Sequence, residues 1–270
     1  MDKLEHLSVI KVSGEDADEF LQGQMTQDTE AINNELIHLT SFCSPQGRVI
    51  ATAFVQTWNE DYYLILRTDL IDDLIAWLSR YILRSQVTIS NEELNISGIS
   101  EDEKKNIDGS YSLSSSQSLK RLANDHTRLI LLSYDDEEKF QTIDKEKWII
   151  QDINTGIPII NKHNTLKYIP QMLNLDQLNA ISFSKGCYTG QEVVARVQHR
   201  GKVKQRLYQI KTELGVVISP QEEVKYLDKK VGYVVISKAY EDVCFGLAAI
   251  NISQINNDLS VDGKLIKLIS

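Results

Sequence analysis

A tight turn followed by a helix is the strongest structural signal in this chain. Residues Lys185–Arg200 read Lys-Gly-Cys-Tyr-Thr-Gly-Gln-Glu-Val-Val-Ala-Arg-Val-Gln-His-Arg. Thr189 and Glu192 have the spacing of a capping box, in which each side chain satisfies a backbone N–H at the helix start. Gly201 stands where such a helix ends, in the left-handed position that favours glycine. The sequence therefore predicts a helix from Gly190 to Gly201.

Cys187 comes just before this helix and is the candidate functional group. The positive end of a helix dipole, with Lys185 two residues away, favours the thiolate over the thiol. Gly186 and Gly190 leave the backbone near the sulfur without side chains, so another molecule could approach it closely. The alternative is an inert buried cysteine, which is the usual state of a free cysteine. The residues alone leave both alternatives open.

Length and charge limit the class of protein. A chain of 270 residues is long enough for one large or two ordinary domains. Its net charge of −9 argues against nucleic-acid binding by the whole surface, because such binding needs a basic footprint. The start, Met1–His6, lacks the apolar core of a signal peptide, and no apolar run approaches membrane-spanning length. We expect a cytoplasmic protein that neither crosses a membrane nor binds nucleic acid directly.

The cysteines and histidines give no sign of a metal site. Cys43, Cys187 and Cys244 lie far apart, and no Cys-x-x-Cys pair is present. Neither a disulfide framework nor a zinc site is therefore indicated. The five histidines show no ligand spacing with acids or cysteines. We predict no resident metal.

Strands and helices mix over the first two hundred residues without regular alternation, which is typical of an α+β body. The clearest predicted helix is Asp69–Ser85, where apolar residues recur at helical spacing. Residues Asp135–Thr142 and Lys145–Asn154 also look helical, and the Ser-rich stretch Asp108–Ser118 is predicted to be an exposed loop. The predicted strands are Leu7–Val12, Leu36–Phe42, Arg48–Trp58, Tyr62–Arg67, Gln86–Ser90, Leu94–Ile99 and Thr127–Ser133.

After Arg206 the pattern changes to short, closely spaced strands, which suggests a small antiparallel barrel. We predict the domain boundary near Gly201, with one domain at 1–201 and a second at 202–270. The predicted strands of the second domain are Leu207–Lys211, Val216–Ser219, Val224–Leu227, Val231–Ser237, Val243–Ile250 and Leu265–Ile269.

The stretch Lys-Gly-Cys-Tyr-Thr-Gly-Gln-Glu, followed by Arg196, resembles the signature of the YgfZ family. These are folate-binding proteins related to the T protein, an aminomethyltransferase, of the glycine cleavage system. The resemblance spans the chain to about Arg206 and implies an aminomethyltransferase-like folate-binding body followed by a small C-terminal β-barrel. Further pieces that agree in order are Phe20–Gln24, Pro45–Arg48, Gly156–Pro158, Ile169–Gln171 and Asn174–Leu175.

The resemblance also implies a function. It points to a tetrahydrofolate-dependent role in making or repairing iron–sulfur enzymes, including tRNA-thiolating ones, with Cys187 and Lys185 as the chemically active pair. Folate and these client enzymes would be the partners. The alternative is a true aminomethyltransferase, which carries an acidic residue soon after the glycine-containing turn. The segment Gly47–Phe54 contains no Asp or Glu, so a carboxylate for acid/base chemistry is missing.

Folate-binding residues follow from the same resemblance. Relatives place a tryptophan at Trp148 against the folate pocket, although core packing is the usual role of a lone tryptophan. They often place a second aromatic where this chain has Leu7, and a glutamate where it has Asn154; Asp152 could supply the missing carboxylate. The remaining positions assigned to folate are Gln171, Asn174, Tyr188, Gly190, Gln191, Glu192 and Arg196.

Positive charge gathers around the signature. From Lys185 to Arg206 there are six Lys or Arg residues and one acid, Glu192. Such a run is usually a solvated face. It could also be a local anion site for the glutamate tail of folate or for a partner.

Overall fold

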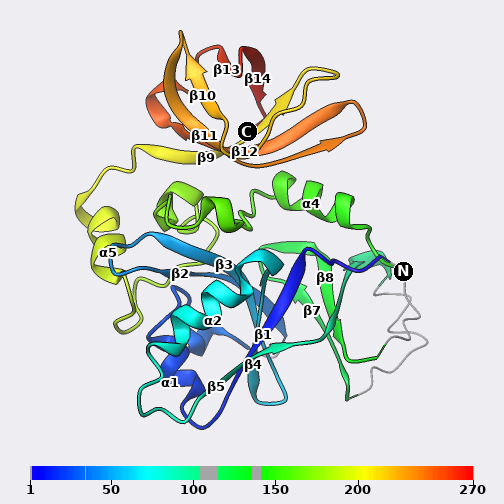
Figure 1. Ribbon diagram of the computed structural model, residues 1–270, viewed down its shortest axis with the longest axis vertical. Coiled ribbons are helices and arrows are strands. Elements are labelled where there is room, and N and C mark those ends of the chain that lie inside the picture. Colours follow the sequence, from blue (N-terminus) through cyan, green and yellow to red (C-terminus); the bar gives the residue numbers. More distant parts are fainter. Residues whose placement is uncertain (1, 34, 104–114, 136–140, 270) are drawn as a thin grey trace.

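The fold consists of an eight-stranded sheet and a closed six-stranded barrel, with helices packed around the sheet (Figure 1). The computed structural model describes residues 2–33, 35–103, 115–135 and 141–269. The chain completes the sheet first, crosses a largely irregular segment, and ends in the barrel. The predicted fold class, an α+β body followed by a small antiparallel barrel, is therefore confirmed. The division at Gly201 stays a prediction.

The sheet has the strand order β5-β1-β4-β3-β2-β7-β8-β6, and every pair is antiparallel except β2 with β7. The central strands β3 and β4 are buried along nearly their whole length, so both faces of the sheet are covered there. The strands are β1 Leu7–Ser13, β2 Leu36–Cys43, β3 Val49–Trp58, β4 Asp61–Arg67, β5 Thr88–Glu92, β6 Asn95–Ser100, β7 Gln117–Leu122 and β8 Asp125–Ser133.

The helices are short and lie on different parts of the sheet. α2 buries Ile71, Leu74 and Leu78, and it contacts β1 and β5. α4 lies between the sheet and the barrel (Figure 1), and the Asp144 carboxylate caps it by accepting from the Lys147 N–H. No helix in the described ranges is long and apolar enough to cross a bilayer. The helices are α1 Ala17–Gln22, α2 Ile71–Ser79, α4 Lys145–Asn154 and α5 Gln191–Arg200, with 3₁₀ turns η1 Thr29–Ala31, η2 Thr68–Leu70, η3 Lys162–Asn164, η4 Pro170–Leu173 and η5 Ile252–Gln254.

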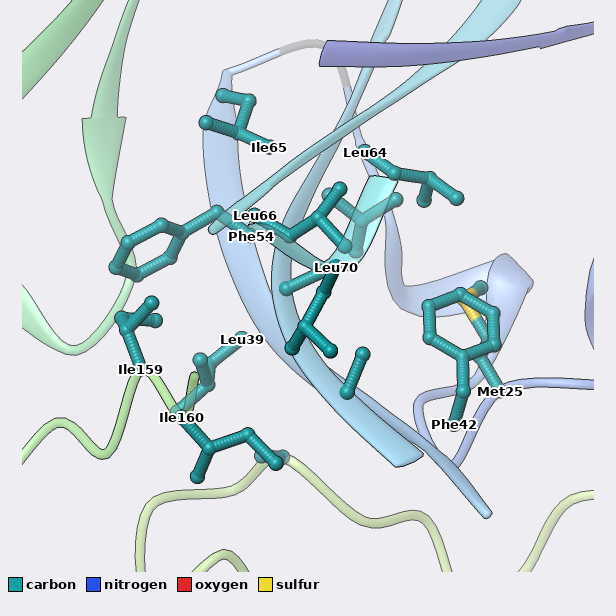
Figure 2. Packing of buried hydrophobic residues seen from close by; sticks show 14 of the residues in the cluster. Met25, Leu39, Phe42, Phe54, Leu64, Ile65, Leu66, Leu70, Ile159 and Ile160 are labelled. Carbon is teal, nitrogen blue, oxygen red and sulfur yellow. The ribbon is translucent and has the colours of Figure 1, made fainter. Parts of the chain in front are cut away.

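One continuous apolar core joins the sheet to the segments that follow it. Figure 2 shows the side chain of Met25, just after α1, beside the ring of Phe42 on β2. In the same view, Ile159 and Ile160 from the segment after α4 lie near Leu39 and Phe54. The core therefore fixes the segment after α1 and the segment after α4 against the same sheet.

The barrel has its own apolar core, and side-chain hydrogen bonds attach it to the body. Asn164 Nδ2 donates to the Val235 carbonyl at 2.7 Å, and Gln209 Nε2 donates to the Asn154 carbonyl at 2.8 Å. Lys238 pairs with Glu146 on α4 at 2.6 Å. Around the barrel the strands run in the order β10 Glu223–Tyr226, β11 Lys229–Tyr240, β12 Val243–Asn251, β9 Gln205–Thr212, β14 Lys264–Leu268 and β13 Leu259–Val261.

Three predicted elements were wrong in extent. The helix predicted over Asp69–Ser85 ends at Ser79, because the chain turns there and Leu83 takes a positive φ of 45°. Residues 216–219 form no strand, and the barrel uses Leu259–Val261 in their place. Part of the predicted loop Asp108–Ser118 is strand β7, while residues 108–114 lie outside the described residues. The same holds for residues 136–140 of the predicted helix Asp135–Thr142.

Candidate functional site

The segment that follows α1, residues 23–27, is hydrogen-bonded to the turn that carries Cys187. The Lys185 side chain is buried, and its Nζ donates to the Met25 carbonyl at 3.0 Å and to the Gln27 carbonyl at 2.6 Å. The same ammonium group lies over the Tyr188 ring, 5.3 Å from its centre. Lys185 therefore ties the turn to a segment about 160 residues earlier in the chain.

Further hydrogen bonds join the same two segments. The Thr189 N–H donates to the Gly23 carbonyl at 3.1 Å, and the Ser182 N–H donates to the Thr26 carbonyl at 2.9 Å. The Gln27 side chain donates to the Asn179 carbonyl at 2.7 Å. Residues 23–27 are thus hydrogen-bonded to the chain both before and after Cys187.

Two glycines allow the β2–β3 turn to pack directly on the start of α5. Gly190 has φ +87°, and a Cβ built on it would lie 2.5 Å from the Ser44 carbonyl oxygen. Gly47 has φ +68°, and its Cβ would lie 2.7 Å from the Val193 Cβ. Neither position accepts a side chain without a shift of backbone or core, since both the conformation and the space exclude one.

The Gln171 side chain holds the next turn of α5. This buried residue of η4 donates through Nε2 to the Val194 carbonyl at 2.8 Å. Arg206, at the start of the barrel, donates to the Gln171 carbonyl at 2.9 Å and pairs with Asp176 at 2.6 Å. The Asn174 side chain donates to the Leu207 carbonyl at 2.8 Å. Gln171 therefore fixes α5, whereas Asn174 attaches η4 to the barrel.

The three cysteines have different surroundings. Cys187 is exposed, whereas Cys43 and Cys244 are buried. Burial raises the pKa of the Cys43 thiol to about 12 and also raises the pKa of the Cys244 thiol. Cys187 is thus the accessible thiol of the chain, at the point where segments from four parts of the sequence meet.

The local structure of the turn corrects several sequence predictions. α5 begins at Gln191, with Gly190 as the cap residue, and no side chain caps it. The predicted capping box is absent because Thr189 Oγ1 faces the Gln24 side chain at 3.3 Å. Gly201 is extended, with φ −97°, so the predicted left-handed conformation was wrong. A glycine is needed there for space instead, since a Cβ would lie 2.9 Å from the Val197 Cα.

Lys185 also has a different position from the one that thiol activation suggested. Within the described part of the chain it makes no hydrogen bond to the Cys187 sulfur, and its ammonium group is engaged by backbone carbonyls. Burial lowers the pKa of Lys185 to about 8, and the negative charges of Asp28 and Asp18 act in the opposite direction. Its contacts make Lys185 a positioning residue, and a direct role in thiol chemistry stays a prediction.

A second polar site lies where α4, the start of β1 and the barrel meet. This cavity of about 210 Å³ is lined by charged and polar residues that include His6, Arg67, Asp152, Asn161 and Lys238. The His6 Nδ1 atom is buried without a hydrogen-bond partner. Burial, together with the charges of Arg67 and Lys145, lowers the pKa of His6 to about 3, so the ring is neutral near pH 7.

Asp152 supplies a buried carboxylate to this cavity. It pairs with the fully buried Arg128 at 2.8 Å, and Arg128 also pairs with Asp125. Burial raises the pKa of Asp152 to about 6, while the Arg128 charge opposes that shift. The carboxylate is therefore mostly ionised at pH 7. Sequence spacing did not indicate a role for His6 or Arg128, because Arg67 and Asp152, which lie near them, come from other segments of the chain.

Trp148 lies in the buried core, next to the Arg128 side chain. Its side chain is 0% exposed, and the Arg128 guanidinium lies 4.4 Å from its ring centre. The Gly98 backbone is so close that a Cβ there would lie 2.3 Å from the ring. Leu7 is also buried. Core packing, the alternative reading of Trp148, describes both side chains here, and their contact with folate stays a prediction.

The remaining folate positions fall into separate groups. Asn154 is exposed at the end of α4, and Glu192 and Arg196 are exposed on α5. Tyr188 is buried, and Gln191 donates to the Gly186 carbonyl at 3.3 Å. Figure 1 shows α5 at the edge of the sheet and α4 between the sheet and the barrel, and a single folate site that joins Trp148 and Cys187 stays a prediction. No described residue of the Cys187 turn lines the polar cavity at α4.

Comparison with known proteins agrees with this architecture. The chain is 30% identical to the tRNA-modifying protein YgfZ of Hamiltonella defensa, over 95% of this chain and 83% of the relative. The chain belongs to the YgfZ family. The YgfZ relative from Serratia proteamaculans is 28% identical over 97% of this chain and 86% of its own length. A Haemophilus influenzae protein described as uncharacterized is 30% identical over 83% of this chain and 79% of its own.

The fold extends beyond the YgfZ family. Residues 2–100 match the family described as the GCVT N-terminal domain. The glycine cleavage system aminomethyltransferase T from Bartonella henselae superposes with a TM-score of 0.69 over 99% of this chain and 84% of that one, at 10% identity. The predicted aminomethyltransferase-like body is thereby confirmed as a fold. Three of the YgfZ motif pieces, Phe20–Gln24, Pro45–Arg48 and Ile169–Gln171, contact the Cys187 turn or α5.

Proposed function

We propose that this protein is a tetrahydrofolate-binding accessory factor that supports the assembly or repair of iron–sulfur enzymes, including enzymes that modify tRNA. Membership in the YgfZ family, whose curated relatives are named tRNA-modifying proteins, supports the cellular context. The observation that carries the proposal is the exposed Cys187 on a turn that three separate segments hold in place. An ordinary surface loop has no need of such long-range support.

The reactive group of the turn would be the Cys187 sulfur. An exposed thiol can act as a nucleophile, a redox group or a soft metal ligand. Lys185 and Gly190 fix the backbone around it, and Gly186 has no atom within 4 Å of where its Cβ would be, so the surface beside the sulfur is open. The client would be an iron–sulfur protein that brings its own cluster or cluster site to Cys187. We predict no direct contact with nucleic acid.

The polar cavity at α4 has groups that fit the pterin end of a folate. The Asp152 carboxylate can accept from a ring N–H and an amino group, and the unpartnered His6 Nδ1 offers a further contact. When bound, tetrahydrofolate would supply a ring nitrogen able to carry a one-carbon group. The cavity of about 210 Å³ is smaller than the roughly 300–1,000 Å³ of pockets that bury a whole drug-sized ligand. It would therefore hold the bicyclic ring and leave the tail outside.

Binding of tetrahydrofolate tests this part of the proposal. A ligand at one hundred times its dissociation constant adds about 2.7 kcal/mol to the free energy of unfolding, which raises the melting temperature. We expect tetrahydrofolate to do so and the Asp152→Asn variant, folded, to respond much less. The exposed Asp72→Asn substitution on α2 is the control. An unchanged melting temperature at saturating tetrahydrofolate, or an equal rise with unrelated aromatic acids, would contradict specific folate binding.

Aminomethyltransferase activity is the second candidate, because the fold is that of glycine cleavage T protein. Strand β3, which follows the Gly47 turn, carries no acidic residue between Val49 and Trp58. A carboxylate that could assist the transfer is therefore missing from the strand where those enzymes carry it. The accessory role is the better-supported function.

A further inference from the structure

A pocket of about 410 Å³ lies where the start of β3, the η4 segment and the barrel meet. Its volume is within the range of small-molecule sites. No residue lines both this pocket and the polar cavity at α4, so the two are separate sites. The lining residues are Arg48, Lys167, Tyr168, Met172, Gln205, Gln221 and Tyr233.

The charges of this pocket all have one sign. Arg48 and Lys167 are the two basic residues in its lining, and no Asp or Glu lines it. Arg48 Nη1 donates to the Lys167 carbonyl at 2.9 Å, and Lys167 Nζ donates to Gln221 Oε1 at 2.5 Å. Both cations are thus oriented by neutral acceptors, and within the described residues neither forms an ion pair with a carboxylate. On a chain with a net charge of −9 this is an exception.

The walls of the pocket are suited to a flat ring. Both lining tyrosines offer a ring: Tyr168 is buried, while Tyr233 from the barrel is partly exposed. Lys230 Nζ donates to the Tyr233 hydroxyl at 2.9 Å, so the barrel adds a further cation near the rim. Two tyrosines and the Met172 side chain offer apolar contact, and the Gln205 and Gln221 amides offer hydrogen bonds.

Two of the segments that line the pocket also contact α5, the helix that follows the Cys187 turn. Arg48 lines the pocket, while its neighbour Gly47 packs on Val193 of α5. Likewise Met172 lines the pocket, while its neighbour Gln171 holds the Val194 carbonyl. Adjacent residues of two segments therefore contact the pocket on one side and α5 on the other.

We propose that this pocket is a binding site for a flat aromatic ligand that carries a phosphate or carboxylate group. The ring would lie among Tyr168, Tyr233 and Met172, and the anionic group would pair with Arg48 and Lys167. Guanidinium and ammonium groups form their strongest hydrogen bonds with such anions. Two sources share this chemistry: a free mononucleotide, and the aminobenzoyl-glutamate portion of a folate. In the second case the inference rests on the proposed folate role.

Calorimetric titration of the intact protein with two probes, adenosine monophosphate and p-aminobenzoyl-L-glutamate, tests the proposal. We expect one of them to bind with a dissociation constant below about 1 mM. Arg48→Ala and Lys167→Gln should each raise that constant at least tenfold, whereas Arg84→Ala, which removes an exposed arginine elsewhere, should change it less than twofold. Neutral adenosine, or aminobenzoate amide for the second probe, should bind at least tenfold more weakly.

The outcomes separate the two sources and the two proposals. Preference for the nucleotide, with an unchanged tetrahydrofolate melting shift in Arg48→Ala, identifies an independent site. Preference for the aminobenzoyl probe identifies an extension of the folate site. Lys167 is exposed, so Lys167→Gln keeps the test valid if Arg48→Ala does not fold. Absence of binding by both probes, or affinities that Arg48 and Lys167 variants do not change, would overturn the proposal whatever tetrahydrofolate does.

Discussion

Cys187 and Lys185, two residues apart, have opposite environments. The thiol is exposed, whereas the lysine side chain is buried and hydrogen-bonded to two carbonyls. A buried lysine whose ammonium group has two backbone acceptors stabilises the turn on which the thiol stands. Residue types and spacing could predict the importance of both, but not this division of roles. It depends on Met25 and Gln27, which the fold brings from the other end of the body.

Alkylation of the native protein should be selective for Cys187. Buried cysteines with raised pKa values react slowly, because both access and thiolate formation are restricted. We expect iodoacetamide at pH 7.5 to label Cys187 at least tenfold faster than Cys43 or Cys244, as read by mass mapping of peptides. In urea, where the fold is lost, the three rates should converge. Equal rates in the native protein would mean that Cys187 has no special accessibility.

His6 should make the fold sensitive to acid. Its pKa is about 3 in the fold and 6.5 when exposed, so its contribution to stability is complete above pH 6.5 and is lost as the pH falls toward 3. Between pH 7.5 and 5 this amounts to at most about 2 kcal/mol of unfolding free energy. Urea unfolding at both values should show the His6→Asn protein losing correspondingly less than the wild type. His163→Asn, at an exposed histidine, is the control, and identical losses in all three proteins would contradict the assignment.

At the scale of elements, the Cys187 turn depends on glycines for two different reasons. Gly190 has a positive φ and no space for a Cβ, whereas Gly186 has nothing within 4 Å of its Cβ position. The first glycine is required by the fold. The second leaves room for a partner beside the sulfur, because no part of this chain occupies that space.

Alanine substitutions should separate these two roles. Gly190→Ala forces a strained conformation and a 2.5 Å contact, and we expect it to lower the free energy of unfolding by about 1–3 kcal/mol. Gly186→Ala should leave that free energy nearly unchanged in urea titrations. Its effect should instead be a loss of support for client enzymes. A Gly186→Ala protein with full function would mean that nothing approaches the sulfur from that side.

Sequence patterns predicted the elements better than their ends. Most strands and α4 lie where alternation or helical spacing placed them, because local periodicity determines them. The start of α5 was misplaced by one residue and its capping box was absent, since Thr189 is engaged by Gly23 and Gln24. The strand Leu259–Val261 was missed because three residues carry no periodic signal. Long-range contacts decided each of these cases.

At the scale of the whole molecule, the site could be predicted only in part. The motif pieces Phe20–Gln24, Pro45–Arg48 and Ile169–Gln171 all converge on the Cys187 turn, which agrees with their common place in the YgfZ family. Trp148 instead lies on α4, which runs between the sheet and the barrel (Figure 1). Spacing along the sequence does not show which distant motifs share a site, and a single folate site that joins Trp148 and Cys187 stays a prediction.

The absence of an acid on β3 leads to a prediction for the whole protein. Supplied with an aminomethyl-loaded lipoyl carrier protein and tetrahydrofolate, it should form no methylenetetrahydrofolate above background. A glycine cleavage T protein assayed in parallel provides the positive control. Steady turnover by this chain at a rate comparable to that control would mean that the protein is an aminomethyltransferase.

The central claim is that the Cys187 sulfur performs the function on a turn that the rest of the molecule holds in place. Complementation of cells that lack their own YgfZ-family protein, read as the activity of an iron–sulfur tRNA-modifying enzyme, tests it most directly. The account predicts that Cys187→Ala folds with a nearly unchanged melting temperature, because the side chain is exposed, and yet restores no activity. Ser184→Ala, an exposed change on the same loop, should restore it fully. Full complementation by folded Cys187→Ala would contradict the claim.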